Sequence, residues 1–204
     1  MELRDLLALR RMTRSFDGTA VDEAWLDQLC ATALWAPTAG NSAGVRFYTL
    51  GSSFVDEYLA VATDAAWRER SRRYEGLRRA GAIVLVTARV SEYLQRYAED
   101  DKSGSALGDE SAWPLPYWHT DAAMATMALL LLLEESGWQA ALWGNFRHGE
   151  AVLKWLNVDE EELFATVFIG RGDGDDLPSA SLSRPVPSRQ ARVTRLTPTP
   201  ESPL

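Results

Sequence analysis

Three arginines gather near the amino end of this chain, where Arg10, Arg11 and Arg14 stand within the segment ALRRMTRSFDG. Their guanidinium groups repel one another unless an anion lies among them, and the arginine fork suits phosphate and carbonyl oxygens. The alternative is a solvent-exposed helix end, where positive charge suits the helix dipole. Arg10 and Arg14 are four residues apart, so they would share one face if the first helix continued through them. The segment therefore indicates either an anion site or a charged helix end.

A second unusual stretch is the loop APTAGNSAG, from Ala36 to Gly44. It is rich in small residues and joins a predicted helix to a predicted strand. Such a loop exposes backbone amides without bulky side chains, so it can lie against a flat ligand. Asn41 offers both a donor and an acceptor to an amide-like edge. The alternative interpretation is a plain connecting turn.

Few other residues offer catalytic chemistry. Cys30 is the only cysteine and falls on the apolar face of its helix, which favours a small buried side chain. His119 and His148 are the only histidines, and both stand near predicted helix starts, which favours capping or surface roles. So few thiols and imidazoles leave no ligand set for a metal. We therefore expect no bound metal, and the sequence assigns no catalytic residue.

Three further stretches have open interpretations. The segment Trp113 to Trp118 follows a polar loop over residues 98–111, which we expect to be a mobile surface loop or lid. The aromatic segment is either a wall that stacks a planar substrate or a rigid, packed lead into the next helix. The arginine-rich residues 68–79 indicate a solvated helix face, or else an attraction for the phosphate of NADPH. The glycine-rich, acidic residues 170–176 indicate a surface turn.

The elements that must position these residues alternate between helical and extended patterns. Asp22 can cap a helix whose apolar residues recur at helical spacing, and Pro37 stops it. A continuous apolar run over residues 82–88 is typical of a central strand. Besides a short helix that ends in Arg10-Arg11, the predicted helices cover residues 22–34, 54–66, 121–136 and 148–158, and the predicted strands cover 45–50, 82–88, 139–144 and 163–170. This order predicts an α/β or α+β layered domain with helices on both faces of a sheet.

The composition limits the partners of this domain. A chain of 204 residues suits one domain or one domain with an arm. The net charge of −8 argues against a nucleic-acid partner. The amino end lacks the features of a signal peptide, and the longest apolar run, residues 122–133, is too short to cross a bilayer. Because a single cysteine fits a reducing compartment, we expect a cytoplasmic protein that binds no membrane.

Taken in order, these features resemble the FMN-dependent nitroreductase family. That family shows R-x-x-x-R-x-F, matched here by Arg10, Arg14 and Phe16, and then A-P-S/T-x-x-N, matched by residues 36–41. The segment YWHTDAAMATMALLLLLEESGWQAALWGNF resembles the family's long central helix, its following strand and a flavin-contacting loop. LFATVFIGRGDGDDLPSASLSRP resembles its last core strand, glycine turn and late arginine. The segments WPLPYW and APTAG also resemble an actinobacterial set of nitroreductase-like proteins.

The resemblance covers residues 1–186 and implies an α+β fold. The expected architecture is a three-layer α/β/α sandwich around a mixed, mainly antiparallel central sheet. The expected assembly is a homodimer. Residues 1–186 would form the FMN-binding domain, and residues 187–204 would form a C-terminal arm on a neighbour or a flexible tail.

The resemblance also implies an FMN in each of two sites at the dimer interface. The amino-terminal arginines would hold its phosphate, ribityl chain and pyrimidine edge, and the late arginine would return to the phosphate. The bare loop of the partner chain would cover the ring, and the residues after the third strand would flank its reactive nitrogen. Arg14 would stabilise the reduced, anionic flavin and raise its potential. The implied cofactor-binding residues are Arg10, Arg11, Met12, Arg14, Pro37, Thr38, Ala39, Asn41, Trp143, Gly144 and Arg184.

The implied activity is ping-pong transfer of a hydride from NAD(P)H through FMN to a nitroaromatic, a quinone or a similar small acceptor. One alternative is an FMN-dependent dehydrogenase or oxidase that desaturates a metabolite or a modified peptide. It stays open because Ala43, Gly44 and Val45 stand where the family often has Gln-Pro-Trp. A third alternative is a non-catalytic flavin-binding or interaction protein.

Overall fold

The computed structural model describes residues 2–145 and 147–196 of the chain. Its four-stranded sheet has the order β1-β2-β4-β3, and each neighbouring pair of strands is antiparallel. The only parallel pairing in the described ranges is an isolated bridge between Met12 and Ala140. The α+β class is confirmed, and the parallel part of the expected mixed sheet is limited to this bridge. The strands are β1 (Val45–Gly51), β2 (Ala82–Ala88), β3 (Gln139–Trp143) and β4 (Glu162–Gly170).

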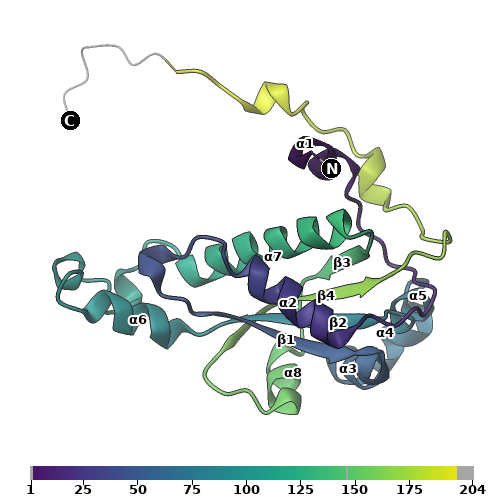
Figure 1. The fold of residues 1–204 in the computed structure, drawn as a ribbon, viewed down its shortest axis with the longest axis horizontal. Helices are drawn as coiled ribbons and strands as arrows, with labels where there is room; N and C mark the ends of the chain where they lie inside the picture. The colour runs from purple at the N-terminus through teal and green to yellow at the C-terminus, as the bar shows by residue number, and fades with distance from the viewer. Residues whose placement is uncertain (1, 146, 197–204) are drawn as a thin grey trace.

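Helices cover both faces of the sheet and form the expected three layers (Figure 1). Helices α2 and α7 pack on one face, while α3, α5 and α8 pack on the other. None of the helices in the described ranges is both long enough and apolar enough to cross a membrane. The helices are α1 (Leu3–Leu9), α2 (Glu23–Ala33), α3 (Val55–Ala62), α4 (Ala65–Arg70), α5 (Tyr74–Arg78), α6 (Val90–Ala98), α7 (Tyr117–Glu135) and α8 (Gly149–Leu156). Short 3-10 helices cover Ala39–Asn41, Ser52–Phe54, Ser103–Ser105, Glu110–Ala112, Ala180–Ser183 and Gln190–Arg192.

Strand β2 is the centre of the core and is buried along its whole length. Its alternate residues point to opposite faces of the sheet, as the pleat of a strand requires. Val84 and Val86 pack toward α2 and α7, while Ile83 and Leu85 pack toward α3 and α8. This two-sided burial explains why the sequence of the strand is apolar without alternation.

Several element boundaries differ from the sequence-based prediction. The predicted helix over residues 54–66 divides into α3 and α4, because the Asp64 carboxylate accepts a hydrogen bond from the backbone N–H of Trp67 and starts a new helix. The long helix begins at Tyr117 instead of Asp121, directly after Pro116. Helix α6 was not predicted: only Tyr93 among its residues is buried, although its apolar side chains gather on one face. The predicted cap of α2 is confirmed, since Asp22 accepts from the backbone N–H of Trp25.

Helix α1 lies beside α7, whereas the C-terminal segment runs away from the body of the domain (Figure 1). Leu6 is the buried residue of α1, whereas Leu3, Leu7 and Leu9 are exposed. Residues 187–196 are exposed throughout. The division into a domain and an arm stays a prediction, and residues 197–204 of the predicted arm lie outside the described residues.

The packing of α7 on the sheet generates a stability prediction. Leu133 is fully buried in the cluster between α7, α2 and the sheet, so Leu133→Ala should lower the free energy of unfolding by about 2–5 kcal/mol. Glu135→Ala, two residues away and exposed, is the control and should stay within about 0.5 kcal/mol of the native protein. The measurement is urea unfolding at one fixed protein concentration. Equal unfolding midpoints for the two variants would contradict the placement of this helix.

Candidate functional site

The arginine segment runs in extended conformation beside the edge strand β3. The backbone N–H of Thr13 donates to the carbonyl of Ala140 at 3.0 Å, and the backbone N–H of Leu142 donates to the Met12 sulfur at 3.3 Å. Helix α1 ends at Leu9, so the condition under which Arg10 and Arg14 would share a helix face is not met. The segment instead carries its arginines along the strand that leads to Trp143.

The three arginines have different environments. The exposed Arg11 donates through Nη1 to the carbonyls of Ala8, Leu9 and Arg10 at the C-terminal end of α1. For Arg11, this supports the interpretation as a charged helix end. Arg10 has a buried Nη1 atom that meets no acceptor among the described residues. Buried polar atoms normally have a hydrogen-bond partner. Arg10 therefore needs an acceptor from outside the described chain.

Arg14 is a second cation with too little compensation. Burial and the neighbouring Arg73 guanidinium lower its pKa, and only Asp176 acts in the other direction. Arg73 precedes α5 and was not singled out from the sequence, where it is one of six arginines over residues 68–79. No sequence signal separates it from its neighbours, because its effect on the Arg14 pKa depends on how the fold brings the two segments near each other. Two cations held side by side favour an anion or an electron-rich edge between them.

The acidic turn after β4 fixes the arginine segment in place. The Asp176 carboxylate accepts from the backbone N–H of Arg14 at 3.2 Å. The Asp173 carboxylate accepts from the Ser15 hydroxyl at 2.7 Å and also pairs with Arg79. The predicted surface turn is thus a turn that anchors the amino-terminal segment.

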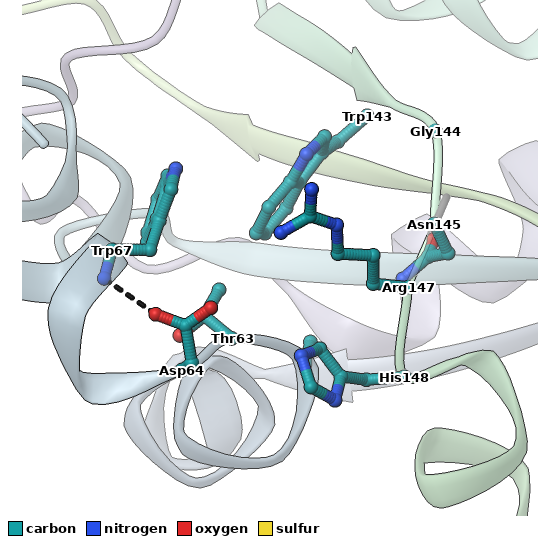
Figure 2. A pocket seen from close by; sticks show the side chains of 9 residues that line it. Thr63, Asp64, Trp67, Trp143, Gly144, Asn145, Arg147 and His148 are labelled. Carbon is teal, nitrogen blue, oxygen red and sulfur yellow. Dashed lines mark hydrogen bonds between the residues drawn. The ribbon is translucent and has the colours of Figure 1, made fainter.

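A cavity of about 270 Å³ opens where β3 ends (Figure 2). Its aromatic wall is the stacked pair Trp67 and Trp143, whose ring centroids are 5.4 Å apart with an interplanar angle of 23°. In Figure 2, Asn145 and Arg147 lie on the side formed by the loop after β3, opposite Trp67 of α4. The cavity is lined by Ala62, Thr63, Asp64, Trp67, Trp143, Gly144, Asn145, Arg147 and His148.

A buried hydrogen-bond triangle sets the position of the loop after β3. Asn145 donates to the Tyr58 hydroxyl and accepts from the Thr166 hydroxyl, both at 2.9 Å. The Tyr58 hydroxyl also donates to Thr166 at 2.7 Å. Burial raises the pKa of Tyr58 to about 12, so it stays a neutral donor. The triangle ties the loop that carries Trp143 and Gly144 to α3 and β4. In the described ranges, no three side chains of His, Cys, Asp or Glu form a group that could hold a metal.

The bare loop lies at the other end of the domain. Residues 37–41 sit beside α6 and the start of α7, whereas the arginine segment passes β3 at the opposite end of the sheet (Figure 1). Pro37 and Asn41 are exposed, and Thr38 and Ala39 are partly buried. Arg184 is exposed in the segment that leaves the domain. Within one chain, Met12 and Arg14 therefore lie in the segment beside β3. The loop of residues 37–41 of the same chain does not reach them.

The aromatic segment after the polar loop is packed. Trp113 contacts the rings of Tyr93, Tyr97 and Trp118, at centroid distances of 6.3, 4.7 and 5.9 Å. Its indole N–H donates to the carbonyl of Leu107 at 2.8 Å. His119 lies in the first turn of α7 and pairs with Glu162. These contacts favour the packed lead into α7 over a wall that is free to stack a substrate.

Comparison with known proteins gives one family and one fold. The Nitroreductase family matches residues 7–171. A nitroreductase family protein from Streptococcus pneumoniae superposes with a TM-score of 0.71 at 18% identity, over 95% of this chain and 100% of that one. The nitroreductase CinD from Lactococcus lactis, in complex with nicotinic acid, superposes with a TM-score of 0.69 at 19% identity, over 92% of this chain and 100% of that one. A nitroreductase-type protein from Desulfovibrio desulfuricans, in complex with FMN, superposes with a TM-score of 0.61 at 19% identity, over 92% of this chain and 99% of that one. No curated protein matches this chain.

The environment of the single cysteine generates a prediction about reactivity. Cys30 is buried on α2, and burial, with a contribution from Asp27, raises the pKa of its thiol to about 12. Because the thiolate is the reactive form, a disulfide reagent at about pH 8 should not label the folded protein and should label it fully in denaturant. Glutathione in the same buffer controls for the reagent. Rapid labelling of the folded protein would contradict the buried, non-catalytic role of this residue.

Proposed function

Because this chain belongs to the nitroreductase family, we propose that it is a homodimeric oxidoreductase that binds FMN at the edge of its sheet. Bound FMN would supply the redox chemistry, which is transfer of electrons from NAD(P)H to a nitroaromatic, a quinone or a similar small acceptor. The residues of the chain would bind and orient the ring and keep water from it. We expect the protein to work in the cytoplasm, as its single cysteine suggests.

The observation that carries this proposal is positive charge without a matching acceptor beside β3. The Arg10 Nη1 atom is buried without an acceptor in the described ranges, and a second cation, Arg73, is near enough to Arg14 to lower its pKa. A phosphate accepts forked hydrogen bonds from guanidinium groups, and the carbonyl edge of a flavin accepts them as well. These residues therefore fit FMN. Arg10 would hold its phosphate or ribityl chain, and Arg14 and Arg73 would hold its pyrimidine edge.

The end of β3 would receive the ring. The Met12 sulfur accepts a hydrogen bond from the backbone N–H of Leu142, so it links the arginine segment to β3 one residue before Trp143. Gly144 leaves the backbone bare there, and the Tyr58–Asn145–Thr166 triangle keeps that backbone in place. The cavity beside Trp143 is then the space for the nicotinamide and, after it leaves, for the acceptor. In a ping-pong reaction one space serves both reactants in turn.

A second copy of the chain would complete the site. Helix α1 leaves Leu3 and Leu7 in water, and α7 exposes Met124 and Met127 on the face opposite to the sheet. Trp35, directly after α2, is 84% exposed. Side chains of this size gain free energy when another surface covers them. We infer that these helices and the arm, with Arg184, lie on the partner, and that residues Pro37 to Asn41 of the partner cover the ring.

Removal of a guanidinium tests the cofactor and its place together. The purified protein should be yellow and should release FMN on unfolding. Arg14→Ala should weaken FMN binding by about 10- to 100-fold, which is the usual loss for a charged hydrogen bond. Arg70→Ala is the matched control, because the exposed Arg70 side chain only donates to the carbonyl of Ala66 in its own helix. The measurement is a titration of the apoprotein with FMN, followed by flavin fluorescence.

Several outcomes would contradict the proposal. A colourless protein that gains neither flavin nor activity when FMN is added would indicate an interaction protein. Equal FMN affinities for Arg14→Ala and Arg70→Ala would reject the assigned site. A flavoprotein that oxidises its substrate with oxygen and is not reduced by NADH or NADPH would be the dehydrogenase of the second alternative. Product analysis with and without NAD(P)H separates these cases.

Charge on the outer face of α7 tests the dimer. The double variant Met124→Glu and Met127→Glu places two carboxylates where an apolar contact is expected, so it should give monomers. Since the ring-covering loop comes from the other chain, these monomers should also lose most of their FMN. Size-exclusion chromatography with light scattering gives the mass, and absorbance gives the flavin content. A monomeric variant with full FMN content would contradict the shared site.

A further inference from the structure

The loop that follows α2 is held by side chains from α6 and α7. The Asp121 carboxylate, 1% exposed, accepts through Oδ2 from the backbone N–H of Ala39 at 2.8 Å and from the Tyr93 hydroxyl at 2.9 Å. Arg96 donates from Nε to the carbonyl of Gly40 at 2.8 Å. The Asp121 carboxylate and the Arg96 guanidinium thus hydrogen-bond to the adjacent residues Ala39 and Gly40 of one short loop.

The conformation of this loop is strained. Gly40, Asn41 and Ala43 have φ values of 61°, 56° and 53°, in the left-handed region. Glycine adopts this region freely and asparagine tolerates it, but alanine does so at a cost. Such a backbone persists only where its surroundings over-determine it, and it is concentrated at functional sites.

The same loop is seated on aromatic rings. A Cβ atom at Gly40 would lie 2.7 Å from the ring of Tyr97, and one at Gly44 would lie 2.4 Å from the ring of Tyr93. Both rings contact Trp113. The two glycines are therefore needed on the inner side of the loop, where it meets α6. The exposed side, with Pro37 and Asn41, is left for a partner.

We propose that Asp121 is a positioning residue, whose buried carboxylate fixes the loop Pro37–Gly44 in the shape that covers the flavin ring of the partner subunit. This inference rests on the proposed function. Asp121 acts through Ala39 and Tyr93 and does not itself touch the cofactor. Its second oxygen, Oδ1, lies 3.5 Å from the Thr120 hydroxyl, whose proton goes to the carbonyl of Tyr117 at 2.8 Å. An amide at this position would remove the negative charge that strengthens the hydrogen bonds from Ala39 and Tyr93.

The main test compares Asp121→Asn with Thr126→Val in the purified dimer. Thr126 is also buried on α7, but its hydroxyl donates to the Ala122 carbonyl of the same helix. Asp121→Asn should weaken FMN binding by about tenfold or more and alter the fine structure of the bound flavin spectrum. It should raise KM for the acceptor more than it lowers kcat, because the misplaced loop forms part of the pocket wall. Thr126→Val should leave the flavin spectrum and KM unchanged.

A second variant keeps the test decisive if Asp121→Asn does not fold. Tyr93→Phe removes only one donor to the carboxylate and keeps the ring under Gly44, so it should show the same spectral change with a smaller loss of affinity. If Tyr93→Phe binds FMN with the native spectrum and affinity, and Asp121→Asn does so too when it folds, the positioning role is overturned. If the native protein binds FMN and Arg14→Ala weakens that binding, such a result leaves the proposed function standing. A native protein without FMN would instead reject the proposed function.

Discussion

Unmatched positive charge beside the edge strand is the constraint on which the rest of the structure depends. The chain as a whole carries a net charge of −8, yet its amino-terminal segment holds Arg10 with a buried, unpartnered Nη1 atom and Arg14 with Arg73 close enough to lower its pKa. The acidic turn after β4 binds the backbone of Arg14 and so holds the segment without neutralising its guanidinium groups. Burial makes the lack of acceptors more costly. A dianionic phosphate joined to a ring with a carbonyl edge would relieve it, which supports the proposed binding of a flavin nucleotide at this place.

The second constraint is geometric. The cationic segment and the bare loop stand at opposite ends of one sheet, while apolar side chains on α1, α7 and the residues after α2 face outward. Both facts have one explanation if two chains pack through these surfaces and each loop reaches the other chain's arginines. The loop must then arrive in a fixed shape, because it has no contact with its own cationic segment. The carboxylate of Asp121 and the tyrosines of α6 hold that shape before any partner is present.

Local sequence patterns predicted most of the fold. The continuous apolar run of β2 and the helical spacing in α2 follow from burial and periodicity, and the structure has both elements. Residue types alone pointed to Arg10, Arg14 and the loop as candidate sites, and the family resemblance added their assignment as FMN ligands, which remains a proposal. Local pattern missed what tertiary contacts decide. Arg73 is one arginine among six, and Asp121 reads as a helix-start residue, although its carboxylate meets Ala39, 82 positions earlier. Helix α6 escaped prediction because it buries so little.

The FMN content of mixed dimers tests the shared site most directly. One chain carries Arg14→Ala, and the other carries Gly40→Val, which places a side chain against the ring of Tyr97. Each kind of chain has a different affinity tag, so dimers that contain one chain of each kind can be isolated. If each site takes its arginines from one chain and its loop from the other, both substitutions of the mixed dimer fall in the same site. The second site of the mixed dimer is then intact, whereas both sites of each parent homodimer carry a substitution. If each chain formed its own site, every site in the mixed dimer would carry a defect, and FMN content no higher than that of the parents would contradict the shared pocket.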